Sequence, residues 1–161
     1  MKILLLILTL LCSEAFGAQA MPTPKAECET LMNAAFAFAE KMLKEHGEFF
    51  PYGAALKPNG EIVSVAGYDG REHPPSTEII RLIKQAFVQA AKTGQYKATA
   101  LVYDVKVTLP SSGQKSDAVA VSLNHRDNYS VIVLIPYQLK KNQLTLGEAF
   151  VQKGEADIFP K

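Results

Sequence analysis

The chain has 161 residues, 17 basic and 16 acidic side chains that leave a formal net charge of +1, and only two cysteines. Its Lys and Arg residues are scattered and matched by acidic residues, which argues against a phosphate backbone, and therefore against nucleic acid, as a partner. Two cysteines are too few for a disulfide framework.

Residues 1–20 have the three parts of a cleavable export signal. Lys2 supplies the positive charge, residues 3–12 form an apolar run, and Ala18-Gln19-Ala20 reads as a small-x-small cleavage site. A run of about ten residues is too short to span a bilayer, which needs about 20. We therefore expect a signal peptide over residues 1–20, one mature domain over 21–161, and a periplasmic or secreted location with no membrane attachment after cleavage.

Cleavage would leave 141 residues, a length that suits one domain with its own core and no need of a metal or disulfide. Cys28 would then be the one remaining thiol, which excludes an internal disulfide and a cysteine-based zinc site. We expect it to be a buried small hydrophobe rather than an intermolecular disulfide. His46, His73 and His125 have no paired spacing, so neither a metal nor a cofactor is predicted.

The first predicted helix covers residues 24–46. Thr23 can cap it, Pro24 suits its first position, and Gly47 can end it. Apolar residues recur at steps of three and four, which predicts a broad buried face. A second helix is predicted from a Ser76 or Thr77 cap to residue 94.

The other predicted elements are antiparallel strands separated by turns rich in Pro, Asn, Ser and Gly. They cover residues 50–56, 61–66, 97–109, 117–125 and 129–137, with a weaker element over 144–150. The chain is therefore predicted as an α+β domain with the order α-β-β-α-β-β-β. Two helices would pack against an antiparallel sheet of about five strands.

Three segments are distinctive when taken together: HGEFFPYGAAL (46–56), YDV (103–105), and SDAVAVSLNHRD (116–127) followed by the Pro-Tyr pair at 136–137. They resemble a family of small, uncharacterised bacterial proteins over most of the mature chain. The resemblance implies a bacterial source and a shared fold, and it brings no known activity. The element order also occurs in profilin-like and roadblock-like domains, an analogy of architecture that carries no function.

The hairpin over residues 51–60 also resembles the first hairpin of cytidine deaminases. Those enzymes need a zinc ligand and a glutamate at the start of the next helix, and two cysteines on the helix after it. Here Pro75-Ser76-Thr77-Glu78 stands at the first position, and no cysteine follows Cys28. The sequence therefore excludes zinc deaminase chemistry.

His125 and Arg126 lie at the end of a predicted strand, where a His beside an Arg can bind an anion or relay a proton. Ordinary turn chemistry with a half-exposed His is the favoured alternative. Asp104 interrupts an apolar run, and a carboxylate facing His125 would make an acid/base pair. Counting the hairpin about Ser112 pairs Asp104 with Ala120, away from His125, which weakens that pair.

These observations favour an exported domain that binds a protein or a small ligand without catalysis. Tyr52, His125 and Arg126 are its candidate binding residues. Two alternatives stay open. One is a hydrolase that uses His125 with Asp104 or Asp117, and the other is an immunity or inhibitor protein for an envelope-acting toxin.

Overall fold

Two helices and seven strands make up the described part of the chain, which covers residues 21–67, 70–71, 74–141 and 143–159 in a computed structural model. The predicted export signal, residues 1–20, lies outside the described residues. The elements in chain order are α1 (Pro24–His46), β1 (Tyr52–Leu56), β2 (Ile62–Val65), α2 (Ser76–Lys92), β3 (Ala98–Thr108), β4 (Lys115–His125), β5 (Tyr129–Lys140), β6 (Gln143–Leu146) and β7 (Phe150–Lys153).

Helix α1 begins and ends where local chemistry predicts. The Thr23 side chain accepts a hydrogen bond from the Ala26 N–H (3.2 Å), and Pro24 follows as the first helical residue. Gly47 has a left-handed backbone (φ 79°), and its N–H donates to the Leu43 carbonyl (3.1 Å). For α2 the predicted side-chain cap is wrong: Pro75 precedes the helix without a capping side chain, and Ser76 is already helical.

All seven strands belong to one antiparallel sheet in the order β2-β1-β3-β4-β5-β6, with β7 also pairing with β5. The α+β class with helices packed on an antiparallel sheet is confirmed. The predicted number of about five strands is too low, because the weak element over 144–150 is replaced by β6 and β7, which pair with successive parts of β5. Each has four mostly exposed residues, and such short segments carry little periodic signal.

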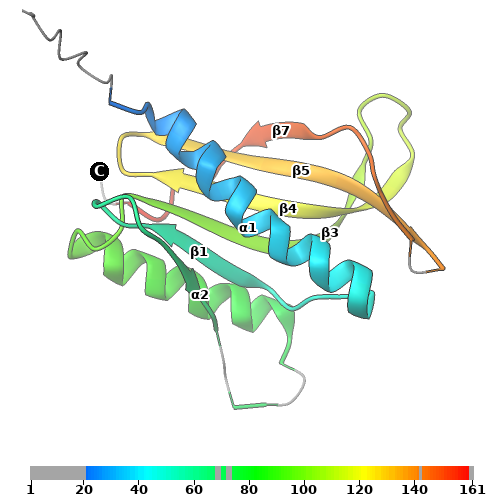
Figure 1. The fold of residues 1–161 in the computed structure, drawn as a ribbon, viewed down its shortest axis with the longest axis horizontal. Helices are drawn as coiled ribbons and strands as arrows, with labels where there is room; N and C mark the ends of the chain where they lie inside the picture. The colour runs from blue at the N-terminus through cyan, green and yellow to red at the C-terminus, as the bar shows by residue number, and fades with distance from the viewer. Residues whose placement is uncertain (1–20, 68–69, 72–73, 142, 160–161) are drawn as a thin grey trace, which may run out of the picture.

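The helices cover opposite faces of the sheet, so the domain has three layers. In Figure 1, α1 crosses one face diagonally, and α2 lies behind the other face below β1. Neighbouring residues of β1 show the same division, since Ala54 packs in the α1 core and Ala55 in the α2 core. Ile158 also packs in the α2 core. Lys84 of α2 binds Glu155 and Asp157 of the same C-terminal segment (2.5 and 2.9 Å).

Gly53 allows α2 to approach β1 closely. A Cβ atom at this position would lie 2.5 Å from Phe87 Cζ and 3.0 Å from Ile83 Cγ2. We expect Gly53→Ala to lower the free energy of unfolding by about 1–3 kcal/mol, because the added methyl overpacks this contact. Urea denaturation measures the change. Combining it with Phe87→Leu should cost less than the two single losses together, and strict additivity would contradict the explanation.

Candidate functional site

His125 is buried beneath the first turn of α1. It is the last residue of β4, and its side chain is only 2% exposed. Its Nδ1 accepts a hydrogen bond from the Asp127 N–H (3.0 Å), which places the ring proton of the neutral side chain on Nε2. Nε2 therefore donates to Glu27 Oε2 (2.8 Å). Both ring nitrogens are engaged within the protein.

The second oxygen of Glu27 binds Lys97, with Nζ 2.5 Å from Oε1. The side chains of Glu27 and Lys97 are 11% and 12% exposed. Burial by itself would raise the pKa of Glu27, but hydrogen bonds from Lys97 and His125 outweigh it and hold the pKa below its ordinary value. The three side chains tie the start of α1 to the start of β3 and the end of β4, which is a structural role.

Arg126 and His125 share a cavity of about 20 Å³ with Asn124, Asn128, Tyr129, Ser130, Ala156 and Phe159. This volume holds roughly one water molecule, since a single water needs at least about 10–15 Å³ of such space. The Arg126 N–H donates to the Lys97 carbonyl (3.0 Å). The predicted binding residues His125 and Arg126 therefore line the same cavity, but this cavity is too small for an organic ligand.

The structure does not bring Asp104 beside His125. Asp104 lies opposite Val119, so the expected pairing with Ala120 is wrong by one residue. The turn is closed by a bond from the Leu109 N–H to the Gln114 carbonyl (2.8 Å), which moves the centre of the hairpin. Val119 and His125 are six positions apart on β4, about 20 Å along a strand.

Asp117, the other carboxylate considered with His125, binds Lys106 instead (2.7 Å). Asp117 lies opposite Tyr137 of β5, eight positions before His125, the last residue of β4. Neither Asp104 nor Asp117 reaches His125, whose carboxylate neighbours are Glu27 at 2.8 Å and the exposed Asp127 at 3.6 Å.

Tyr52 lies apart from His125 and Arg126, and its hydroxyl is inserted into the backbone of α1. The hydroxyl donates to the Ala35 carbonyl (2.6 Å) and accepts from the Ala39 N–H (3.0 Å), two groups that pair with each other in a regular α-helix. Burial raises the pKa of Tyr52 to about 12, against the opposing bond from Ala39. The ring contacts Phe38 edge-on, with centroids 4.9 Å apart. Tyr52 could therefore contact a ligand through its ring, but not through its hydroxyl, which is engaged with α1.

That ring forms part of an apolar groove between α1 and β2, which we call the edge groove. Its volume is about 280 Å³. The lining residues are Ala34, Ala35, Phe38, Tyr52, Gly53, Ala54, Ile62, Ser64, Val65 and Ala66. Most are small, which leaves a depression, and Phe38 and Ile62 remain 49% and 36% exposed. Sequence reasoning named Tyr52 as a binding residue but grouped it with His125 and Arg126. It missed the rest of this site, because the lining residues come from three elements and none is chemically unusual.

Strand β2 borders the edge groove and, among the described residues, pairs only with β1. At the turn, the Lys57 N–H donates to the Glu61 carbonyl (2.9 Å). Antiparallel pairs alternate in hydrogen bonding, so Val63 and Val65 direct their backbone groups to β1. The N–H and C=O groups of Ile62 and Ser64 then point away from the sheet.

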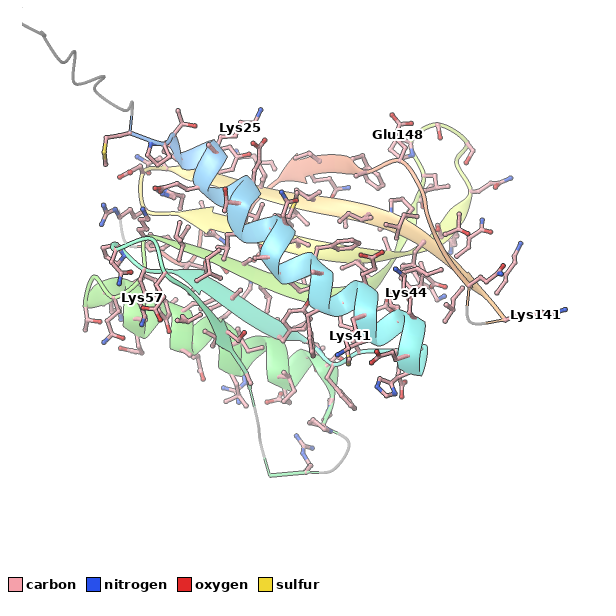
Figure 2. All side chains as sticks on the ribbon, viewed as in Figure 1. Lys25, Lys41, Lys44, Lys57, Lys141 and Glu148 are labelled. Carbon is pink, nitrogen blue, oxygen red and sulfur yellow. The ribbon has the colours of Figure 1, made fainter. Side chains whose placement is uncertain are left out.

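The two edges of the sheet differ in how open they are to another strand. Gly147-Glu148-Ala149 interrupts the edge formed by β6 and β7, and Figure 2 shows Glu148 at this interruption and Lys141 at the far tip of the β5–β6 turn. Charges and breaks of this kind discourage strand addition. The residues of β2, Ile-Val-Ser-Val, carry no charge and no proline.

The thiol of Cys28 lies in the core beneath α1. Cys28 is fully buried, as predicted, and burial raises the pKa of its thiol to about 12. Within the described ranges, no three His, Cys, Asp or Glu side chains gather as metal ligands would. No helix in that same part of the chain is both long and apolar enough to cross a membrane.

Comparison with known proteins finds no matching family model, no matching curated protein and no matching solved structure.

We expect Glu27→Gln to destabilise the domain by about 3 kcal/mol at neutral pH, because Lys97 would keep a buried charge without its partner. The lowered pKa of Glu27 implies a contribution that is complete above the ordinary value of 4.5 and is lost as pH falls through the folded-state pKa. The difference between wild type and variant should therefore shrink in acid, as measured by urea unfolding at a series of pH values.

Glu29→Gln is the matched control, since Glu29 lies on the same helix with its side chain 55% exposed. It should change stability little at any pH. An equal effect of the two variants would contradict the role given to Glu27.

Proposed function

We propose that this chain is an exported, non-catalytic binding domain that takes an extended segment of a partner protein along β2. The observation that supports this most directly is the outward-facing backbone of Ile62 and Ser64 beside the edge groove. The export part of the proposal rests on residues 1–20 of the sequence.

An extended polypeptide is the ligand whose chemistry fits this edge. Its backbone N–H and C=O groups would pair with those of Ile62 and Ser64 and add a strand to the sheet. Alternate side chains of a strand point to the same face, so every second residue of the added segment would lie over the edge groove. The exposed ring of Phe38 and the side chain of Ile62 favour apolar residues there.

A partner protein fits this surface better than a second copy of the chain. A two-fold pairing of β2 with itself would place the same patch on both sides of the interface. Such a pairing continues the sheet and leaves the two grooves side by side on one face, so that the strand of one copy does not fill the groove of the other. A segment that carries large apolar side chains fills the groove instead.

The absence of catalysis is proposed from how the candidate groups are used. His125 is engaged through both ring nitrogens, and the Tyr52 hydroxyl is engaged with α1. A nucleophile or general base needs a group that can reach a substrate.

The test uses a displayed library of random peptides selected against residues 21–161. Selected peptides should bind to wild type and to Ser64→Ala alike, while Ser64→Pro should weaken binding at least tenfold. Proline removes the outward N–H of residue 64 without removing a bond to β1. Phe38→Ala should weaken binding several-fold. Fluorescence anisotropy measures the affinities, and urea unfolding confirms that each variant is folded.

Two outcomes would overturn the proposal. One is a set of peptides whose affinity is the same for Ser64→Pro and Ser64→Ala. The other is concentration-dependent dimerisation, seen by analytical ultracentrifugation and abolished by Ser64→Pro, which would assign the edge to a second copy.

A further inference from the structure

A second cavity, which we call the acidic cavity, lies near the C-terminal end of α1. Its volume is about 260 Å³. Residues from the end of α1, the segment before β1, the first turn of α2, β3 and β5 line it, and those that define its chemistry are Glu48, Phe49, Phe50, Ser76, Asp104 and Tyr137. The cavity therefore combines carboxylates with aromatic rings.

Asp104 is held in a fixed position at this cavity. Its Oδ1 accepts a hydrogen bond from the Tyr137 hydroxyl (3.0 Å), and Tyr137 is nearly buried. No lysine or arginine lines the cavity in the part of the chain that the structure describes. The nearby cations Lys44 and Lys106 bind Glu40 and Asp117, both at 2.7 Å.

The negative charge of Asp104 is unfavourable in the free protein. Asp104 is exposed to solvent on one side, yet partial burial raises the pKa of its carboxyl. The Tyr137 hydrogen bond opposes this rise, the charge of Asp117 adds to it, and the Val105 N–H and the charge of Lys106 lower it by smaller amounts. A bound cation would relieve this cost. The aromatic side chains of Phe49, Phe50 and Tyr137 are the second attraction, since rings bind cations through their π-faces.

We propose that the acidic cavity binds a small organic cation, an ammonium or a guanidinium, with Asp104 as its counter-ion and the rings of Phe50 and Tyr137 as its walls. The volume limits the ligand to a small head group, because pockets for larger ligands occupy about 300–1,000 Å³. This site shares no lining residue with the edge groove, so it does not depend on the function proposed for β2.

The test is calorimetric titration of residues 21–161 with choline and with 3,3-dimethyl-1-butanol, its neutral isostere. Choline should bind, and the alcohol should bind at least tenfold more weakly. Methylguanidinium, titrated separately, distinguishes a guanidinium site from a quaternary ammonium site, and stronger binding of either cation supports the proposal. Neither cation binding more tightly than the alcohol overturns it.

Variants separate the site from a structural role. Asp104→Asn should reduce cation affinity at least tenfold, while Asp127→Asn, which removes an exposed carboxylate beside the buried His125, should leave it unchanged. Phe50→Ala should reduce it several-fold. In the absence of ligand, Asp104→Asn should be at least as stable as wild type, because a neutral side chain avoids a partly desolvated charge and can still accept from Tyr137. Unchanged affinity in Asp104→Asn, or equal losses in both Asp variants, would overturn the assignment.

Discussion

The carboxylate of Glu27 fixes helix α1 on the sheet, and most of the surface described above follows from where that helix lies. Lys97 and His125 hold the two oxygens of Glu27 at the start of the helix. The Tyr52 hydroxyl holds the backbone of α1 near its middle. These polar anchors are directional, whereas the apolar core beneath α1 tolerates small shifts of the helix. The polar contacts therefore fix the position of α1 on the sheet more closely than apolar packing alone would.

Both proposed binding sites lie where α1 no longer covers the sheet, one along the side of the helix and one at its C-terminal end. Along its side, α1 leaves the α1 face of β2 open, and the small residues Ala34, Ala54 and Ser64 deepen the gap into the edge groove. At its end, Gly47 reverses the chain, and the segment that follows brings Phe49 and Phe50 beside Asp104. One site has apolar walls and a strand backbone with no partner on its outer side among the described residues, and the other has carboxylates and rings. The two sites therefore suit ligands of different chemistry.

The three layers also explain the composition of the central strands. Residues of β1 and β3 contact a helix on each face, so small side chains such as Gly53, Ala55 and Ala100 occur where the layers approach most closely. This packing limits the distance between the sheet and each helix. The polar groups at the ends of the strands then set the orientation of the helix on the sheet. Thr99, next to Ala100 on β3, is buried without a hydrogen-bond partner for its hydroxyl among the described residues.

The sequence alone determined the elements whose causes lie within a few residues. The bounds of α1 follow from Thr23, Pro24 and Gly47, and the antiparallel strands follow from alternation and turn residues, because caps and turns are local interactions. The class and most of the order of elements could therefore be predicted. The short edge strands β6 and β7 could not, since each has only four, mostly exposed residues that take their conformation from β5.

Only the tertiary structure decided which side chains meet. Glu27 and His125 are 98 residues apart, and nothing in the sequence near either of them indicates the other. A shift of one residue in a turn changes every cross-strand pair, which is why Asp104 meets Val119 and not Ala120. The edge groove and the acidic cavity are spaces between elements, and such spaces exist only once helices and strands have packed.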